Sequence, residues 1–313
     1  MSIPASAPSS LEAVSDRIAD LCDTIAPRLV AIHGPRRRSS TGIIWRPGLV
    51  LTAEEALEAD EDILVARPDG SQVSASLAGR DPSTDIALLR IEEQPTHESP
   101  LPDLTFADTS RLRVGHFVLA AGRRAEGVCA AFGIVALAGG PWRSLRGGHI
   151  DRRLHLDLRL DARSEGGAAL DLDGTIVGMT VLGPRGRVLV IPSETIERVA
   201  QQLLAHGRIA RGYLGLGLQP VRIDETVADA AGLAEPKGLI VINVDSGGPG
   251  QKAGLKQGDI LIRWQTDPLH SIRRVYTLLG PESVGQSVPL GILRAGKQMS
   301  LTVEIAERPK PQE

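Results

Sequence analysis

The fold class is decided by the stretch Asp161-Ala-Arg-Ser-Glu-Gly-Gly-Ala-Ala-Leu170, which runs into the turn signature Asp171-Leu-Asp-Gly174. An apolar run of strand length follows at residues 175–181. Glycine and aspartate favour tight turns, and short runs rich in Val, Ile and Leu favour strands over helices. This part of the chain therefore predicts short strands divided by turns.

The same pattern extends outward through most of the first two thirds of the chain. A second turn signature, Pro68-Asp-Gly70, lies between two of the runs. So many short strands with few helical patterns among them predict a β-barrel or sandwich pair over residues 28–192. The predicted strands lie at 29–32, 42–45, 49–51, 63–66, 86–91, 117–120, 133–137, 154–160, 175–181 and 188–191.

Two helices flank this β-rich region. Ser9-Ser-Leu-Glu12 resembles a capping box, and apolar residues then recur at helical spacing from Leu11 to Ile25. We therefore expect an amphipathic helix in an N-terminal segment, 1–27. A second helix is predicted from Ser193, with Gly207 as its stop, in a linker at 193–210.

A smaller unit is predicted at 211–308, before a polar tail at 309–313. It alternates apolar runs at 238–244, 259–263, 288–293 and 300–305 with a glycine-rich turn and a helical stretch at 272–279. About a hundred residues is an ordinary domain size, so this region predicts a small mixed β/α domain.

Composition limits the classes of function. The chain has 313 residues, of which 42% are hydrophobic and 3% aromatic, and its net charge is -3. This charge gives no general attraction to nucleic acid, and the basic patch Arg36-Arg-Arg38 is interpreted as a solvated loop. The two cysteines, Cys22 and Cys129, match no metal-ligand spacing. The sequence shows no membrane span and no export signal, so we expect a cytoplasmic location if Met1 is the true start.

Three longer motifs resemble HtrA/Deg-type proteins, in which a trypsin-like double β-barrel precedes a PDZ domain. They are Asp23-Thr-Ile-Ala-Pro-Arg-Leu-Val30, Arg80-Asp-Pro-Ser-Thr-Asp-Ile-Ala-Leu-Leu-Arg90 and the junction Ala205-His-Gly-Arg-Ile-Ala-Arg-Gly-Tyr-Leu-Gly215. The resemblance covers nearly the whole chain. It implies a mainly β fold, with the double barrel followed by the PDZ domain.

The resemblance also locates the positions of the family's catalytic triad. Leu51-Thr-Ala-Glu-Glu-Ala-Leu57 is similar to the loop of the histidine base and has Glu55 at that position. Ser83-Thr-Asp-Ile-Ala-Leu88 retains the orienting aspartate as Asp85. Where the family has Gly-Asn-Ser-Gly-Gly, this chain has Arg163-Ser-Glu-Gly-Gly167, so Glu165 replaces the nucleophile.

These replacements predict that the family reaction fails. Acyl transfer needs a hydroxyl or thiol activated by a base, with backbone N–H groups directed at the oxyanion. A carboxylate at Glu165 attacking an amide would give an anhydride far more reactive than the amide. Ser164 could replace the nucleophile only with a base beside it, and His116, His149 and His155 lie in segments unlike the base loop.

The resemblance would bring Glu55, Asp85 and Glu165 into one cleft. Two like charges ~5 Å apart at a dielectric near 20 repel by roughly 3 kcal/mol. Relief could come from a raised pKa with a shared proton, from pairing to Arg163 or Arg159, from solvent exposure with the side chains apart, or from a divalent cation. No cofactor is expected, and the metal-binding acidic cleft remains an alternative.

The last domain carries the pattern of a peptide-binding site. A PDZ domain binds a peptide as an added strand and receives its C-terminal carboxylate on free backbone N–H groups. Tyr213-Leu-Gly-Leu216 resembles the family's carboxylate loop, in which Gly215 lets the backbone come close. The strand edge offered to the peptide would be Leu216–Leu218. Leu214 and Leu216 would line the apolar pocket, with Val275 and Leu279 facing them.

The leading hypothesis is a catalytically inactive HtrA-like pseudoprotease that binds peptide or protein C-termini. It would act as a scaffold or regulator, with an active relative or a homotrimer as further partners by resemblance, and no nucleic acid. The alternatives are a serine-type endopeptidase with an unanticipated nucleophile and the metal-binding cleft.

Overall fold

The computed structural model describes residues 10–35, 39–91, 104 and 106–309. The basic patch at 36–38, Ser9 of the capping box and most of the polar tail lie outside these residues. The chain divides into two compact units, one of residues 1–144 with 149–209 and one of residues 145–148 with 210–313. Each unit is described by itself.

The first six strands form a closed barrel in the order β1-β2-β3-β6-β5-β4. All neighbours are antiparallel, and side chains such as Val30, Val50, Val65 and Leu89 fill the interior. β5 is absent from the sequence-based prediction because its alternation is mostly small and polar. The strands are β1 Leu29–His33, β2 Ser39–Arg46, β3 Leu49–Thr52, β4 Ile63–Ala66, β5 Gln72–Asp81 and β6 Ile86–Ile91.

Six later strands close a second barrel in the order β11-β14-β13-β12-β7-β8. Its core contains Val118, Val135, Leu154 and Val190. A short hairpin, β9 Trp142–Arg143 with β10 His149–Ile150, is inserted between β8 and β11. The strands are β7 Phe117–Arg124, β8 Gly127–Gly139, β11 Arg153–Asp157, β12 Ala168–Leu170, β13 Ile176–Leu182 and β14 Val188–Pro192.

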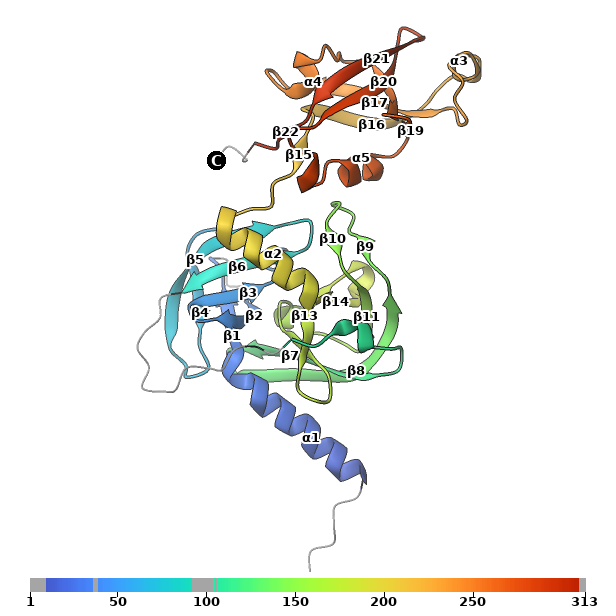
Figure 1. Cartoon of the computed structure of the whole chain (residues 1–313). Helices are drawn as coiled ribbons and strands as arrows, with labels where there is room; N and C mark the ends of the chain where they lie inside the picture. The colour runs from blue at the N-terminus through green and yellow to red at the C-terminus, as the bar shows by residue number, and fades with distance from the viewer. Residues whose placement is uncertain (1–9, 36–38, 92–103, 105, 310–313) are drawn as a thin grey trace, which may run out of the picture. The chain divides into compact units, whose positions relative to one another are not determined.

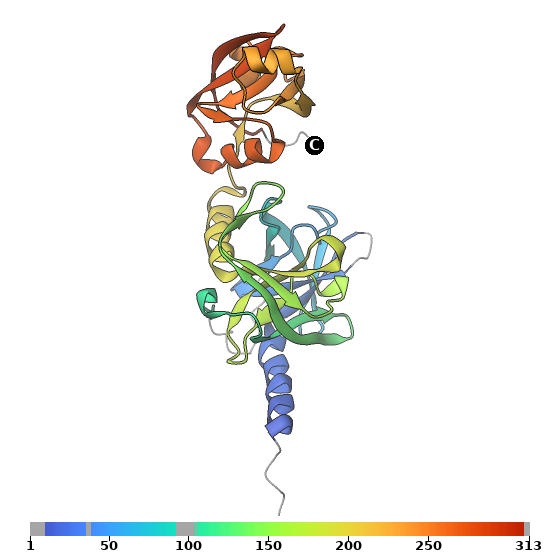
Figure 2. The same ribbon diagram turned by 90° about the vertical axis from the view of Figure 1, so that its right-hand side faces the viewer.

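The two barrels lie side by side and share a large apolar core (Figure 1). Outward-facing residues of β2 and β3, such as Ile43 and Leu51, join Leu119 of β7 and Met179 of β13 in one cluster. The turned view shows the same two barrels, with helix α1 (Ser10–Ile25) projecting from them (Figure 2). This packing brings loops of both barrels to one junction, and the triad-equivalent positions lie on those loops.

Helix α2 (Ser193–His206) corrects the prediction of a linker helix. Ile196, Val199 and Leu203 are all buried in the inter-barrel cluster, so the helix is part of the barrel unit. Gly207 ends it as predicted, in the left-handed conformation at φ 71°. A sequence of apolar residues at helical spacing predicts a helix, but not which surface it covers.

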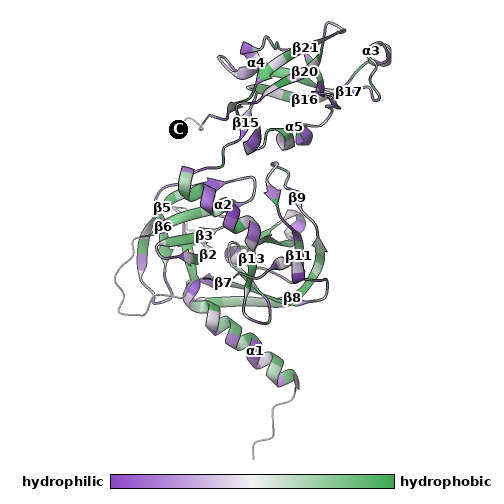
Figure 3. Ribbon diagram, in the orientation of Figure 1, coloured by the Kyte–Doolittle hydropathy of each residue, from purple (hydrophilic) through white to green (hydrophobic). Residues whose placement is uncertain are grey.

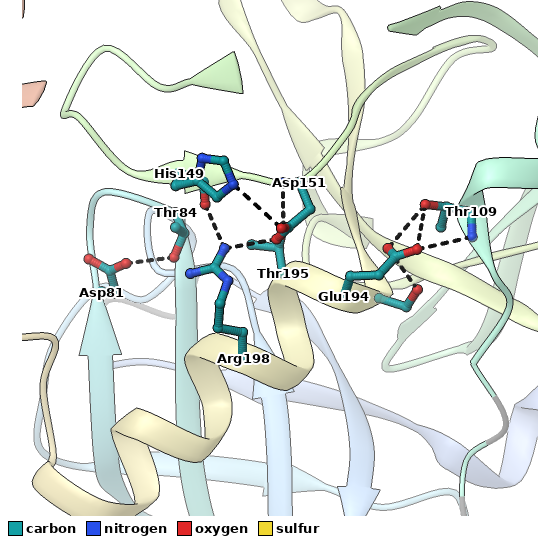
Figure 4. Close-up of polar contacts among 9 residues, drawn as sticks. Asp81, Thr84, Thr109, His149, Asp151, Glu194, Thr195 and Arg198 are labelled. Carbon is teal, nitrogen blue, oxygen red and sulfur yellow. Dashed lines mark hydrogen bonds and ion pairs between the residues drawn. The ribbon is translucent and has the colours of Figure 1, made fainter. Parts of the chain in front are cut away.

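Polar contacts hold the start of α2 on the second barrel (Figure 4). Asp151 accepts hydrogen bonds from Thr195 Oγ1 at 2.7 Å and from Arg198 Nη2 at 2.8 Å. The Glu194 carboxylate accepts from the backbone N–H of Thr109 at 3.1 Å and from its hydroxyl at 2.8 Å. These contacts fix the polar side of the first turns of α2 on the barrel surface. The opposite, apolar side of the helix is then directed to the core.

The second unit has a five-strand path in the order β16-β17-β18-β20-β21, with β19 paired to β18. Its core contains Leu239, Leu261, Trp264 and Leu290. β15 pairs only with β22 in a separate two-stranded sheet. The elements are β15 Gly212–Tyr213, β16 Leu216–Arg222, α3 Glu225–Ala230, β17 Lys237–Val244, α4 Pro249–Lys252, β18 Ile260–Trp264, β19 Asp267–Pro268, α5 Ile272–Leu278, β20 Ser287–Arg294, β21 Lys297–Glu304 and β22 Ala306–Glu307.

Hydropathy follows this architecture (Figure 3). The barrel strands are predominantly hydrophobic, whereas α1 alternates hydrophobic and hydrophilic residues along its length. Among the described residues, no helix combines the length and the apolar character that crossing a bilayer would need.

Candidate functional site

Asp85 is positioned by a tight turn at the end of β5. The Asp81 carboxylate accepts hydrogen bonds from the Ser83 hydroxyl at 2.6 Å and from the Thr84 hydroxyl at 2.7 Å, and Figure 4 shows the latter contact. The chain then passes through Asp85 at φ 59°, a conformation that aspartate tolerates better than most residues. The turn holds Asp85 half-buried at the start of β6.

Asp85 contacts the loop of the absent base through the backbone. The N–H of Glu55 donates to Asp85 Oδ1 at 2.8 Å, whereas the Glu55 residue itself is exposed. The preceding Glu54 is buried and forms an ion pair with Arg80, whose guanidinium also contacts Asp60. Sequence reasoning missed Glu54 and Arg80, because only the fold shows that they pair with each other.

Glu165 joins the two barrels. Its side-chain Oε1 accepts the N–H of Leu182 in β13 at 2.7 Å, and its backbone carbonyl accepts the N–H of Thr41 in β2 at 2.9 Å. Glu165 is half-buried. Both the carboxylate and the backbone carbonyl of Glu165 therefore accept hydrogen bonds from the barrels.

Burial determines the electrostatics of the cleft. It raises the pKa of Asp85 to about 7, with further increases from the negative charges of Glu55, Glu165 and Glu54, against the opposing effect of the Glu55 N–H. Burial also raises the pKa of Glu165, partly offset by the Leu182 N–H and reinforced by the charge of Glu55. Charge repulsion is thus relieved by proton uptake near neutral pH and by backbone donors.

The expected arginine pairing does not occur. Within the described chain, Asp85 and Glu165 form no ion pair with Arg163 or Arg159. Arg163 lies exposed on the 3-10 helix η3 (Ala162–Ser164). The arginine that contacts this loop is Arg124, which pairs with Asp161 at 2.8 Å.

The backbone donors that would form an oxyanion hole are already bonded. In the trypsin-like template, these donors are the N–H of the nucleophile position and that of the residue two before it. Here the Arg163 N–H donates to Asp161 Oδ1 at 2.9 Å, and the Glu165 N–H donates to the Ala162 carbonyl at 3.3 Å. The helical turn η3 therefore directs both groups into the loop instead of the cleft.

Ser164 is buried and faces away from a base. It is 3% exposed, and its hydroxyl lies 3.1 Å from Cys129 Sγ, in space left by the absent side chain of Gly122. The three histidines have other partners: His116 contacts Arg113, His149 contacts Asp151, and His155 contacts Arg153.

The acidic residues do not assemble into a metal site. No group of three His, Cys, Asp or Glu side chains in the described ranges is placed to hold an ion. The metal alternative therefore has no support in the geometry.

The peptide-binding loop of the second unit has the features that an added strand requires. β16 is an edge strand, paired only with β17. Gly215 adopts φ 67°, and a Cβ there would lie 3.3 Å from Gly248 Cα. Across the described residues, the N–H groups of Leu214 and Gly215 donate to no acceptor. Two hydrogen bonds fix the loop in place. The Leu214 carbonyl accepts the N–H of Gly250 at 2.7 Å, and the Gly215 carbonyl accepts the N–H of Asp245 at 2.9 Å.

The predicted pocket residues differ in accessibility. Leu214 and Val275 are 3% and 4% exposed and belong to the domain core. Leu216, Leu218 and Leu279 are partly buried against that core, and so is Ile272, which the sequence reasoning missed. Tyr213 donates its hydroxyl to Asp245 Oδ2, and the Asn243 side chain donates to Asp245 Oδ1 at 2.7 Å. A ligand side chain would therefore meet the partly buried residues, while Leu214 and Val275 support them.

Together, a closed pair of antiparallel barrels and a following domain with a free strand edge define a protein of the trypsin-like class joined to a PDZ domain. The family model described as a trypsin-like peptidase domain matches residues 40–179, and the PDZ domain model matches residues 212–305.

Similarity to known proteins is extensive. The chain is 31% identical over 270 residues to a "Probable periplasmic serine endoprotease DegP-like" of Bartonella henselae, covering 84% of this chain and 52% of that protein. For the relative of the same description in Halomonas elongata, identity is 30% over 293 residues, covering 90% and 59%. The chain thus spans a little over half the length of these curated relatives.

The chain is also similar to solved protein structures. The serine endoprotease from Yersinia pestis aligns with a TM-score of 0.69 at 25% identity, covering 97% of this chain and 100% of that one. The HtrA-type protease AlgW with tripeptide aligns with a TM-score of 0.66 at 26% identity, covering 94% and 98%. The chain thus resembles HtrA/DegP-type proteins in its order of domains, a trypsin-like domain that precedes a PDZ domain.

Proposed function

We propose that the chain is a catalytically inactive HtrA-type protein that acts as a peptide-binding scaffold or regulator. The observation that carries this proposal is the state of residue 165: a carboxylate bonded to the Leu182 N–H occupies the position of the nucleophile. The bonded N–H groups of Arg163 and Glu165 remove a second requirement of acyl transfer.

The binding function is assigned to the PDZ domain. Its free N–H groups at Leu214 and Gly215 suit a C-terminal carboxylate, and the edge of β16 suits a peptide backbone. One similar protease of known structure is described with a tripeptide. The proposed ligand is therefore a polypeptide with a free C-terminus, in the groove between β16 and α5.

Two measurements on the purified full chain test this proposal. A fluorophosphonate probe and fluorescent casein should give neither labelling nor turnover, and labelling of any serine together with casein cleavage would contradict the inactive assignment. Peptides with an apolar last residue should bind in fluorescence anisotropy. The same peptides with an amidated C-terminus should bind at least tenfold more weakly, because the amide removes the charge.

An endopeptidase using an unanticipated nucleophile is the second candidate. The observation that favours it is the close contact between Ser164 and Cys129 beside the family's nucleophile position. Any turnover in casein should then disappear in both Ser164→Ala and Cys129→Ser. Turnover that survives both substitutions would exclude this pair.

We also propose self-association through an exposed apolar surface of the barrel unit. Phe117 and Phe132 are 47% and 37% exposed and stack with ring centroids 5.0 Å apart. In addition, Leu11 and Val14 of α1 are 82% and 43% exposed, although the same helix face is buried further along at Leu21.

Sedimentation velocity of the full chain should show an assembly, and the family leads us to expect a trimer. This assembly should dissociate in the double variant Phe117→Ser/Phe132→Ser. A parent chain that remains monomeric would refute this.

We propose a cytoplasmic location. The alternative is the periplasm, because similar proteins are described as periplasmic. Cell fractionation of the protein expressed from its natural gene distinguishes the two. Recovery in the periplasmic fraction would refute the cytoplasmic assignment.

A further inference from the structure

The residues of β16 direct their backbone groups alternately to β17 and to the free edge. At one end the Gly215 carbonyl accepts the N–H of Asp245 at 2.9 Å, and at the other the Ile223 N–H donates to the Pro236 carbonyl at 2.9 Å. Alternate residues of an antiparallel strand face the same neighbour, so the odd-numbered residues face β17. The backbone groups of 216 and 218 therefore face the free edge.

Side chains of β16 alternate in the same way between the two faces of the sheet. Leu216 and Leu218 are partly buried against the core of the domain. Successive side chains of a strand point to opposite faces, so position 217 belongs to the outer face. This position is a glycine, and it carries no side chain to cover that face.

This alternation fixes where the side chains of a bound peptide would point. The proposed carboxylate site lies at the N–H groups of Leu214 and Gly215, so the last ligand residue would lie opposite Leu216 and the penultimate one opposite Gly217. Residues directly opposite each other in a ladder place their side chains on the same face. The last side chain would therefore enter the apolar pocket, and the penultimate side chain would lie over Gly217.

Two side chains of β17 border the space beside Gly217. A Cβ at this glycine would lie 3.1 Å from Asn243 Cβ and 3.2 Å from Ile242 Cγ1. Asn243 already donates its side-chain amide to Asp245 Oδ1 at 2.7 Å. Ile242 is 48% exposed and offers a large apolar surface at this point.

A β-bulge accounts for the position of Ile242. Gly217 pairs with Asn243 and Leu218 pairs with Val241, so Ile242 is an extra residue without a partner in β16. Bulges redirect the side chain of the extra residue, and here it lies beside its neighbour Asn243 on the outer face. The exposed isoleucine is therefore a consequence of the local backbone.

The hydrogen-bond ladder that β16 offers to a peptide is short. Leu216 and Leu218 each present an N–H and a carbonyl to the free edge, but the next residue facing that edge is Pro220, which has no N–H. Backbone pairing is therefore concentrated on the last residues of the ligand. Side-chain contacts of those same residues then contribute a larger share of the binding.

We propose that the PDZ domain selects the penultimate residue of its ligand as well as the last one, because a large apolar side chain there packs over Gly217 against Ile242. This inference rests on the proposed peptide-binding function and names its ligand more closely, as a polypeptide whose last two residues are both apolar. The two side chains are held on opposite faces of the sheet, one in the pocket beside Leu216 and the other on Ile242.

Fluorescence anisotropy on the full chain compares two fluorescein-labelled peptides with free C-termini. Both end in leucine, and their penultimate residue is leucine in one and serine in the other. The parent should bind the first peptide about fivefold more tightly, because packing on Ile242 removes apolar area of the penultimate leucine from water. Ile242→Ser should bind both peptides equally. The matched control Met299→Ser changes another exposed apolar residue, on β21, and should keep the preference of the parent.

Methyl NMR provides the second readout. The Ile242 δ1-methyl signal, identified by its loss in Ile242→Ser, should show an intermolecular nuclear Overhauser effect to the penultimate leucine of the bound peptide. Equal affinities of the parent for both peptides, or a preference that survives in Ile242→Ser, would overturn the inference and leave the peptide-binding function standing. Failure of both peptides to bind would contradict the proposed function, and the inference with it. Ile242→Thr takes the place of Ile242→Ser if circular dichroism shows that the latter is unfolded.

Discussion

Asp85→Asn should stabilise the barrel unit at alkaline pH and have little effect in acid. The folded pKa of Asp85 is about 7 and its ordinary value is 3.8, so ionisation of this carboxyl opposes folding. At 1.36 kcal/mol per pKa unit, the full cost is about 4 kcal/mol, and partial contact with water reduces it to roughly 2 kcal/mol. Asparagine keeps an oxygen that can accept the Glu55 N–H and cannot ionise.

The sign follows from linkage. Because the folded pKa is raised, the parent has the full benefit of a protonated Asp85 only below pH 4 and loses it as the pH rises to about 7. The variant has no such loss. The difference in unfolding free energy between Asp85→Asn and the parent should therefore be only about 0.5 kcal/mol at pH 4.5 and reach roughly 2 kcal/mol at pH 8.

Urea denaturation followed by tryptophan fluorescence measures this difference. Both proteins carry Trp264→Phe, which leaves Trp45 and Trp142 to report on the barrel unit. Asp173→Asn, an exposed carboxylate in the β12–β13 turn, is the matched control for net charge. A difference that does not change between pH 4.5 and pH 8, or that appears equally in the control, would refute the assignment of a raised pKa to Asp85.

Three further outcomes are expected. Leu203→Ala should lower the free energy of unfolding of the barrel unit by about 2–5 kcal/mol in urea titrations, because the Leu203 side chain of α2 is fully buried against the barrels; a loss below 0.5 kcal/mol would mean that α2 is not docked. Gly215→Val should abolish anisotropy binding of peptides with a free C-terminus, because valine is strained at φ 67°; unchanged binding would exclude this loop as the carboxylate site. Arg294→Met should lower the melting temperature of the PDZ unit, since it leaves the buried Asp259 carboxylate without its bidentate partner; an unchanged melting transition of that unit would contradict this.

The sequence predicted the β-rich architecture well because short apolar runs separated by turn residues have a local cause. The run at 175–181 became β13 at Ile176–Leu182, and Gly207 ends α2 in the conformation expected of a glycine stop. Strands with small or polar residues, such as β5 and β12, escaped prediction. β5 lies between β4 and β6, and β12 lies between β13 and β7, so these two strands are recognised from their pairing in the barrels and not from an apolar pattern of their own.

The candidate site, too, could be predicted from the sequence only in part. The absence of a hydroxyl at Glu165 is a property of the residue type, so the sequence alone predicts that the family's acyl-transfer chemistry lacks its nucleophile at this position. How the carboxylates are accommodated was decided by tertiary structure. The Glu55 N–H reaches Asp85 across 30 residues, and the Leu182 N–H reaches Glu165 across 17.

Sequence therefore determined the apolar strands, the turns and the two flanking helices, together with the identity of each chemical group. Only the folded chain decided which backbone N–H faces which carboxylate, that Leu214 and Val275 lie in the core of the second unit, and that α2 packs on the barrels. The physical reason is that hydrogen bonds and burial depend on distances between atoms. Those distances are set by the closure of two barrels and not by any local pattern of residues.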